Sequence, residues 1–254
     1  MYKIRYIDKI ETEKSESLIF GDIFGKCINY ILSDTERVDL KVELLIKDYD
    51  LKNEFFVAKV KQLPKIAKLW IDFFSINRYT YNFEYKIYGK IFGFDYSGYI
   101  DALEDDLSLD CISIVENKTI SKFDEEDILQ KLPYDKQLCL YIVDVTTKKR
   151  ENDNRPIKIN YRNFIKPMIK PLKNESPSIF GHRFYETIDT DILTYFNEIS
   201  KPVIFFRIDE FLDEFKESCT LLEKQLELNM FPKNSSACNI YNKCEYFDIC
   251  YKKG

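Results

Sequence analysis

The sequence contains little glycine and histidine and no long apolar run. Its 254 residues include seven glycines and one histidine, His182. So few glycines exclude long flexible linkers, and the chain has no internal repeat or low-complexity tract. No uninterrupted apolar run approaches the roughly 20 residues that a membrane-spanning helix needs. The sequence also lacks a Gly-x-x-x-x-Gly-Lys-(Ser/Thr) loop, so nothing in it indicates an ATP-driven motor.

The composition is typical of a globular enzyme, with 45% hydrophobic and 32% charged residues. The chain is long enough for one large domain, or for a domain with an appendage. Residues Met1–Tyr6 are charged and aromatic and lack the apolar core of a signal peptide, so we expect a cytoplasmic protein without membrane segments. We expect its seven cysteines to be reduced rather than paired in disulfides.

The net charge of −5 argues against a surface covered with nucleic-acid-binding charge. It is compatible with a DNA enzyme, since only the active face of such an enzyme must be basic. Residues 148–173 hold nine Lys or Arg against two acids, Glu151 and Asp153. Two interpretations of this basic segment stay open: a solvated hairpin, or a flap that contacts phosphates beside an active site.

Alternating helical and strand patterns predict an α/β fold with a mixed central sheet flanked by helices. In the first predicted helix Gly21 and Gly25 would each cost about 1 kcal/mol relative to alanine, so we expect close packing there. The predicted helices cover residues 16–34, 63–75, 123–132, 134–144, 183–199 and 209–228. The predicted strands cover residues 80–100 (a pair turning near Tyr88–Gly89), 111–116, 157–166 and 202–207.

Acidic and basic side chains end two of the predicted strands. Asp101 ends the stretch that begins after Gly98, and Glu116 and Lys118 end the next stretch. Two carboxylates can share a hard divalent cation, and a lysine beside them can neutralise charge that develops on a phosphate. Residues 116 and 118 share one face of a strand. The pattern therefore predicts metal-assisted hydrolysis of a phosphodiester; a polar strand end and a surface ion pair are the alternatives.

The order of these motifs resembles the RecB-like branch of the PD-(D/E)xK nuclease superfamily. In that family a Gly-x-x-Asp strand precedes a strand ending in (Asp/Glu)-x-Lys, often followed by Thr, and then a helix with Gln-x-x-x-Tyr. The corresponding residues are Gly98–Asp101, Glu116–Thr119 and Gln137–Tyr141. The resemblance covers about residues 1–145 and the last twenty residues. It implies a restriction-endonuclease-like core, which we place over residues 1–230.

The resemblance implies a Mg²⁺- or Mn²⁺-dependent deoxyribonuclease. Its substrate would be single-stranded DNA or duplex ends, cut exonucleolytically during recombination, repair or phage replication. Lys118 would orient the water nucleophile, and Gln137 with Tyr141 would support the lysine strand and contact the DNA backbone. From the residues alone, this glutamine and tyrosine could equally satisfy each other's hydrogen bonds. The implied metal ligands are Asp101, Glu116 and Asn117.

One departure from the family lies in the first predicted helix. The family usually carries a metal-ligating histidine or glutamate there, and Gly25 stands at that position in Phe20–Gly25. Either Asp22 or a water substitutes, or metal affinity is reduced, or catalysis is lost. A catalytically inactive DNA-binding or assembly subunit is therefore the second hypothesis. A CRISPR adaptation nuclease, working within a complex with partner proteins, is the third.

The tail, residues 231–254, contains three cysteines, Cys238, Cys244 and Cys250, separated by five residues each. This spacing fits structural zinc poorly, whereas four-thiolate iron–sulfur clusters tolerate wider loops. The run resembles the tail of iron–sulfur RecB-like nucleases, which implies a [4Fe–4S] cluster; zinc or no metal are the alternatives. In those relatives the fourth cysteine comes from the N-terminus, just before a segment that resembles residues 2–10. The equivalent position in this sequence would lie upstream of Met1. Three readings stay open: Cys27 ligates, the native start lies upstream, or the cluster is lost.

Overall fold

The computed structural model describes residues 14–33, 36–77, 79–105, 109–149 and 152–230. Residues Glu16–Phe211 form one compact unit, and the described residues 212–230 belong to a second. Helix α9 (Ile208–Glu227) confirms the helix predicted over residues 209–228, and Phe211 is its one buried residue. The predicted division between a core and a tail at residue 230 stays a prediction, because residues 231–254 lie outside the described part.

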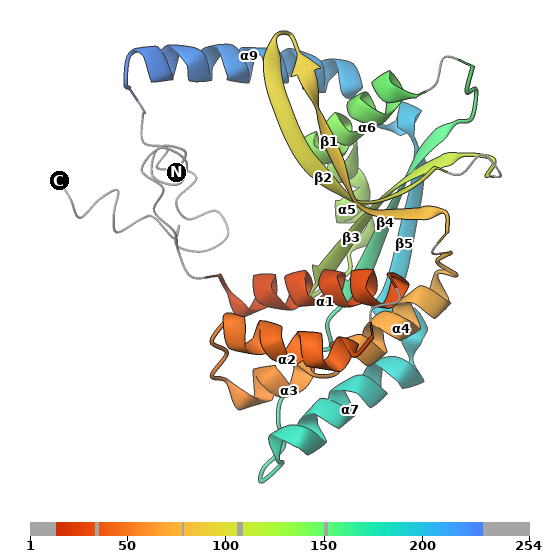
Figure 1. The fold of residues 1–254 in the computed structure, drawn as a ribbon, viewed down its shortest axis with the longest axis vertical. Helices are drawn as coiled ribbons and strands as arrows, with labels where there is room; N and C mark the ends of the chain where they lie inside the picture. Colours follow the sequence, from red (N-terminus) through yellow and green to blue (C-terminus); the bar gives the residue numbers. More distant parts are fainter. Residues whose placement is uncertain (1–13, 34–35, 78, 106–108, 150–151, 231–254) are drawn as a thin grey trace. The chain divides into compact units, whose positions relative to one another are not determined.

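Five strands form one mixed sheet in the order β1-β2-β3-β4-β5 (Figure 1). Strands β3 and β4 are parallel, and all other neighbours are antiparallel. The α/β fold with a mixed central sheet is therefore confirmed. The strand bounds are β1 (Tyr81–Ile91), β2 (Phe94–Glu104), β3 (Ile112–Ile120), β4 (Ile157–Ile165) and β5 (Phe196–Pro202).

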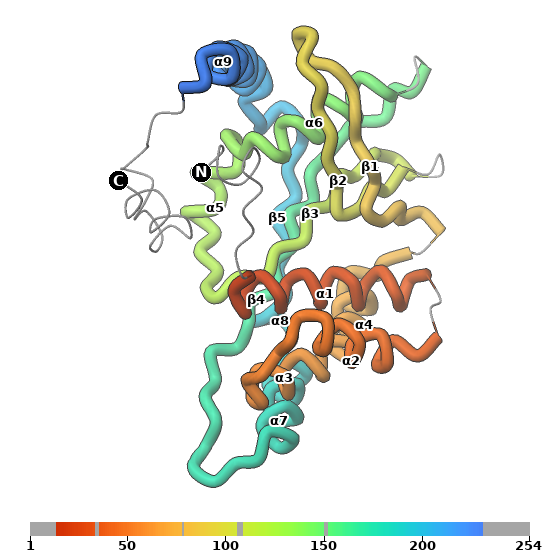
Figure 2. The backbone as a smooth tube through the Cα atoms, turned by 60° about the vertical axis from the view of Figure 1, so that its left-hand side comes forward, coloured from red at the N-terminus to blue at the C-terminus, as the bar shows by residue number. Residues whose placement is uncertain are grey.

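Helices flank this sheet on more than one side (Figure 2). Helices α1 to α4 and α7 gather at one end of the strands, and α5 and α6 lie along another side. Helix α6 follows a short 3₁₀ turn at Leu132–Tyr134, which contains Pro133, the residue left between the helices predicted over 123–132 and 134–144. The helix bounds are α1 (Glu16–Leu32), α2 (Val38–Asp48), α3 (Glu54–Val60), α4 (Leu63–Phe73), α5 (Glu125–Lys131), α6 (Lys136–Lys148), α7 (Pro177–Thr190) and α8 (Ile192–Tyr195).

A cluster of buried aromatic rings joins α1 and α4 to the sheet. Phe24 of α1 contacts Trp70 of α4 and Phe164 of β4, with ring centroids 5.5 and 4.9 Å apart. Trp70 and Phe164 also contact Phe196 of β5, at 5.0 and 5.5 Å. Buried aromatic pairs of this kind contribute about 0.5–1.5 kcal/mol each beyond the area that they bury. They hold α1 in a fixed position against the strands.

The two glycines of α1 have different surroundings. A Cβ at Gly21 would lie 2.8 Å from Thr119 Oγ1 of β3, so the expected close packing is confirmed there. A Cβ at Gly25 would have no atom within 4 Å, so packing does not explain this glycine. Gly181 of α7 is the tightest of the helical glycines, since a Cβ would lie 2.7 Å from the backbone oxygen of Ala58 in α3.

The hairpin turn lies four residues later than predicted. Strand β1 continues through Tyr88 and Gly89, and the turn falls on Phe92 and Gly93, both with positive φ (52° and 88°). Two consecutive residues with positive φ form the two-residue hairpin turn whose twist matches that of the flanking antiparallel strands. Gly89 sits inside the strand because the Tyr96 ring covers it: a Cβ would lie 2.6 Å from the Tyr96 hydroxyl.

The predictions for residues 183–207 are wrong in part. Helix α7 already starts at Pro177, after Ser176 caps it by accepting from the N–H of Ile179, and it ends at Thr190. Residues 196–202 form β5, and residues 203–205 form a 3₁₀ turn instead of a strand. Pairing with β4 and burial of Phe196 and Ile199 override the local helical pattern. Helices α2 and α3 lie outside every predicted element.

The middle of the basic segment is a strand of the central sheet and not part of a solvated hairpin. Its residues 157–165 form β4, which lies between β3 and β5. Arg155 pairs with Asp153 at 2.6 Å, and Arg162 is buried and pairs with Glu198 at 2.7 Å. These two cations of the segment therefore form ion pairs within the fold.

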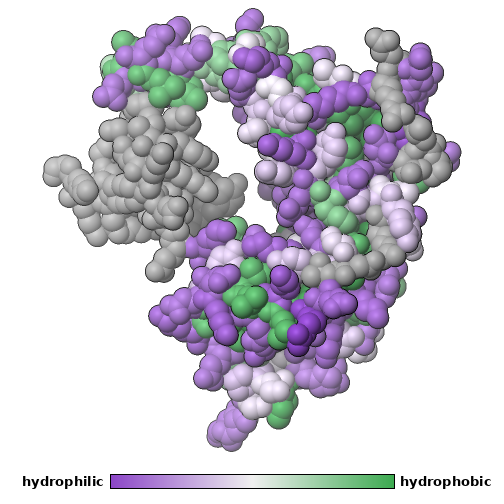
Figure 3. Space-filling model, in the orientation of Figure 1, coloured by the Kyte–Doolittle hydropathy of each residue, from purple (hydrophilic) through white to green (hydrophobic). Residues whose placement is uncertain are grey.

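The surface over α1 to α3 is mostly hydrophilic in Figure 3, with hydrophobic side chains gathered in its midst. Leu40 and Leu44 of α2 are among the exposed hydrophobic residues. No helix in the described part of the chain combines the length and the apolar character needed to cross a membrane.

We predict opposite effects of alanine at two helical glycines. Gly181→Ala should lower the free energy of unfolding by about 1–3 kcal/mol, because the added methyl group meets backbone. Gly25→Ala should raise it by up to about 1 kcal/mol, because the site is open and alanine favours helix. Urea unfolding measures both. Equal stability of Gly181→Ala and the wild type would contradict the close contact of α7 and α3.

Candidate active site

Strands β2 and β3 part at the predicted acids. Their ladder contains three pairs, of which Ala102 with Val115 is the last, although both strands continue beyond it. The next residues are Asp101 and Glu116. Asp101 Oδ2 accepts a hydrogen bond from the N–H of Asn117 at 2.7 Å. Where the strands separate, the Asp101 carboxylate thus takes the place of the backbone carbonyl that would otherwise accept the N–H of Asn117. The acids lie inside their strands, not at the strand ends as predicted.

Glu116 is a buried carboxylate with one free oxygen. Its side chain is 2% exposed, and Oε1 accepts from the ammonium group of Lys118 on the same strand. Its Oε2 is buried and has no hydrogen-bond partner. The alternative of a surface ion pair on an edge strand is wrong, because β3 lies between β2 and β4. Burial, together with the charge of Asp101, raises the pKa of Glu116 to about 7 despite the attraction of Lys118.

The other two charged groups interact with this carboxylate. Burial raises the pKa of Asp101, as does the charge of Glu84, against the opposing effects of the Asn117 N–H and Lys118. Burial by itself lowers the pKa of Lys118, but the Glu116 and Asp101 carboxylates outweigh it and the pKa is raised. Lys118 therefore carries a stable positive charge between two carboxyl groups that compete for protons.

Gln137 and Tyr141 tie α6 to β2. Asp135 caps α6 by accepting from the N–H groups of Gln137 and Leu138. The Gln137 amide donates to the Tyr141 hydroxyl, which donates to the carbonyl oxygen of Tyr99 at 2.5 Å. The interpretation that the two side chains satisfy each other is confirmed. Because Tyr141 is 3% exposed, its evident role is to fix β2 two residues before Asp101.

A cleft of about 410 Å³ lies between α1 and the strands. Asp101, Asn117 and Lys118 line it from the sheet, and Gly25 lines it from α1. Gly25 stands where the resembled family carries a further metal ligand. This position thus faces the predicted site but has no side chain that could bind a metal. Asp22 also lines the cleft, but its carboxylate is held by Lys26 at 2.8 Å and by the Tyr49 hydroxyl.

The oxygen atoms of this site fit a small hard cation. Glu116 Oε2 and Asn117 Oδ1 are buried without hydrogen-bond partners, and Asp101 uses one oxygen for the N–H of Asn117. Magnesium typically binds through one or two carboxylates and keeps several waters. Within the described ranges no group of three His, Cys, Asp or Glu side chains comes close enough to hold a metal. The two strands β2 and β3 therefore offer two carboxylates to a cation, Asp101 and Glu116.

Glu84 is a residue of the site that the sequence pattern missed. It lines the cleft from β1 and lies between the pairs Phe83–Ala102 and Tyr85–Ile100, opposite Asp101. Its backbone has a positive φ of 41°, and Asn29 of α1 donates to its carboxylate at 3.0 Å. In sequence it is an ordinary polar residue of an alternating strand, so no local signal identifies it.

Cys27 is the predicted cluster ligand that lies in the described part of the chain, and it does not line the cleft. Cys27 is fully buried in the apolar core, where burial raises the pKa of its thiol to about 12. A cluster has no room beside a thiol that apolar core side chains surround, so this position argues against the reading in which Cys27 ligates. Cys238, Cys244 and Cys250 lie outside the described residues. His182 is exposed on α7 and contacts Glu186 at 3.1 Å.

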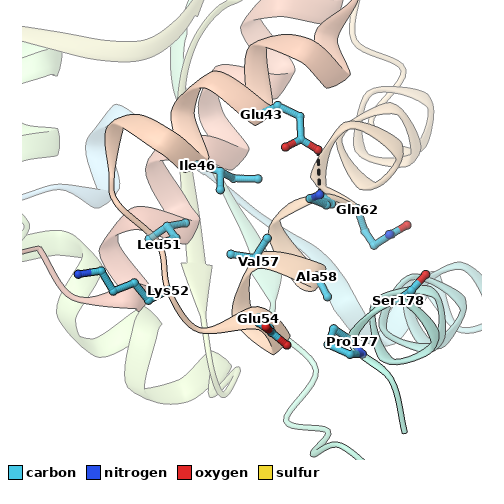
Figure 4. Close-up of a pocket in the computed structure, with 11 residues that line it drawn as sticks. Glu43, Ile46, Leu51, Lys52, Glu54, Val57, Ala58, Gln62, Pro177 and Ser178 are labelled. Carbon is cyan, nitrogen blue, oxygen red and sulfur yellow. Dashed lines mark ion pairs between the residues drawn. The ribbon is translucent and has the colours of Figure 1, made fainter.

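A second pocket, of about 470 Å³, lies between α2, α3 and α7 (Figure 4). Its charged groups Glu43 and Lys61 pair with each other at 2.9 Å. None of the predicted site residues lines it, so this pocket is distinct from the cleft that Asp101 and Lys118 line.

A scan of the chain against protein-family models found no match. Searches of curated proteins and of solved structures found none either.

We predict that Glu116 makes the metal-free protein less stable as the pH rises. Its pKa is about 7 in the folded chain, against an ordinary value of 4.5, so losing the proton disfavours the folded state between these values. The loss should reach up to about 3 kcal/mol. Thermal unfolding in EDTA should show Glu116→Gln to be more stable than the wild type at pH 8 and similar to it at pH 4.5. Parallel curves for the two proteins would contradict the raised pKa.

Proposed function

We propose that the protein is a metal-dependent nuclease that hydrolyses phosphodiester bonds in DNA. The observation that carries this proposal is the buried Glu116 carboxylate, which holds Lys118 on one side and keeps a free oxygen near Asp101. The order of the motifs, which resembles the RecB-like PD-(D/E)xK nucleases, supports it. A buried charge that only stabilised the fold would be unusual, because desolvation of an ion pair offsets most of its attraction.

In the proposed reaction a water molecule attacks the phosphorus in line with the leaving oxygen. Asp101 and Glu116 would hold Mg²⁺ or Mn²⁺, which lowers the pKa of water and stabilises charge on the phosphate. Lys118, held by Glu116, orients the nucleophile and offsets the negative charge that develops on the phosphate oxygens. The Asn117 N–H keeps the Asp101 carboxylate in place. Tyr141 keeps the β2 backbone in place through the Tyr99 carbonyl.

We propose DNA ends or single strands as the substrate, as the resemblance implies, in recombination, repair or phage replication.

One observation favours a second candidate, a catalytically inactive DNA-binding or assembly subunit. Gly25 leaves the cleft without a ligand from α1 and has no packing role that would explain it. Retention of the buried Glu116–Lys118 pair favours the active enzyme over this candidate.

The first test is cleavage of end-labelled single- and double-stranded DNA with Mn²⁺ or Mg²⁺. We expect the wild type to cut and Lys118→Ala to be slower by roughly 10²–10³-fold, the usual effect of removing one group that stabilises developing charge. Lys122→Ala is the matched control, because this lysine is 82% exposed beyond the end of β3. No cleavage by the wild type, with DNA binding retained, would favour the inactive subunit.

A second test adds a ligand at the open position of α1. Gly25→His should lower the Mn²⁺ concentration needed for half-maximal cleavage, because the new side chain enters an open cleft that Asp101 and Lys118 also line. Gly25→Ala is the control and should leave that concentration unchanged. An unchanged Mn²⁺ requirement in Gly25→His would mean that this position lies too far from the metal.

A further inference from the structure

The exposed face of the β1–β2 hairpin extends directly from Asp101. Exposed and buried residues alternate along both strands, and Asp101 belongs to the alternating set that faces outward on β2. Lys86 pairs with Tyr99, and Tyr88 pairs with Ser97, in the register of the two strands. On the face that contains Asp101, the first cross-strand pair toward the turn is therefore Lys86 opposite Tyr99.

Tyr99 lies close to the proposed reaction centre. Side chains two residues apart on a strand share a face and lie about 7 Å apart. Of the two β2 residues at this spacing from Asp101, Leu103 is buried and Tyr99 is exposed. Its surface is 58% exposed. Among the described residues its side chain has no hydrogen bond, ion pair or ring contact, and neither has Lys86.

The backbone beneath this ring is fixed although the ring is free. The Tyr99 carbonyl accepts the Tyr141 hydroxyl, which in turn is held by Gln137. A rigidly mounted aromatic ring is the usual platform for an unpaired base, and a lysine next to it suits the phosphate of the same strand. On the next pair of this face the centroid of the Tyr88 ring lies 4.4 Å from the ammonium group of Lys148 of α6, which also pairs with Asp144 at 2.7 Å.

We propose that Tyr99 and Lys86 form a subsite for one unpaired nucleotide next to the bond that is cut. The base stacks on the Tyr99 ring, and the Lys86 ammonium group pairs with the adjoining phosphate. This inference rests on the proposed nuclease function and specifies its substrate class. A base in an intact duplex is covered on both faces by its neighbours, so the subsite selects single strands and unpaired ends.

The test is binding of labelled single-stranded and duplex oligonucleotides in EDTA, followed by fluorescence anisotropy. Tyr99→Ala should weaken single-strand binding by roughly 5–100-fold, the range expected for loss of one stacked base, and Tyr99→Phe should restore it. Lys86→Ala should weaken binding and reduce the salt dependence by about one phosphate contact. Duplex binding should change little. Tyr79→Ala is the control, since this residue is 80% exposed and does not line the cleft.

A base analogue reports the stacking itself. With 2-aminopurine at successive positions of the strand, the wild type should quench one position, and Tyr99→Ala should lose that quenching while keeping its unfolding temperature. Unchanged binding and quenching in folded Tyr99→Ala would overturn the subsite. If Tyr99→Ala binds and cuts DNA like the wild type, while Lys118→Ala does not cut, the nuclease proposal holds and the subsite does not. A wild type that neither binds nor cuts any oligonucleotide would overturn both proposals.

Discussion

The separation of β2 from β3 is the constraint on which the site depends. If the ladder continued past Ala102 and Val115, backbone hydrogen bonds would close the space between the strands. Instead the Asp101 carboxylate takes the N–H of Asn117, so the strands part without leaving that donor unsatisfied. The close approach of α1 at Gly21 and Thr119 then sets the opposite wall of the cleft. Fold and site are linked through these few contacts.

The energetics of the site point to function more than to stability. Glu116 loses hydration on burial and recovers it only in part through Lys118, since its second oxygen has no partner. A folded chain tolerates such a group when the rest of the core compensates. The aromatic cluster around Phe24 and Trp70 provides such compensation, and it is located where α1 must be held against the sheet. This packing thus supports the helix that forms the wall of the cleft opposite Asp101 and Asn117.

Sequence alone predicted the parts of the site that depend on local geometry. Glu116 and Lys118 are two apart on one strand, and Gln137 and Tyr141 are four apart on one helix, so their spacing defines their relation. Glu84 and Tyr99 depend instead on hairpin register. A turn at Tyr88–Gly89 would have set Ile76, not Glu84, opposite Asp101. The actual turn falls at Phe92–Gly93, where both residues have positive φ, and Gly89 lies inside β1 beneath the Tyr96 ring, a contact between strands that no local pattern reveals.

The open position at Gly25 also bears on the order in which the proposed nuclease binds its ligands. Asp101 and Glu116 are the two carboxylates proposed as ligands, and no group of three His, Cys, Asp or Glu side chains in the described part of the chain could hold a metal. Magnesium sites of this kind are completed by oxygen atoms of a substrate phosphate. Metal and nucleic acid would then bind together, each raising the affinity for the other by the same factor. In that case the Tyr99–Lys86 subsite, by holding a strand next to Asp101, contributes to metal binding as well as to substrate choice.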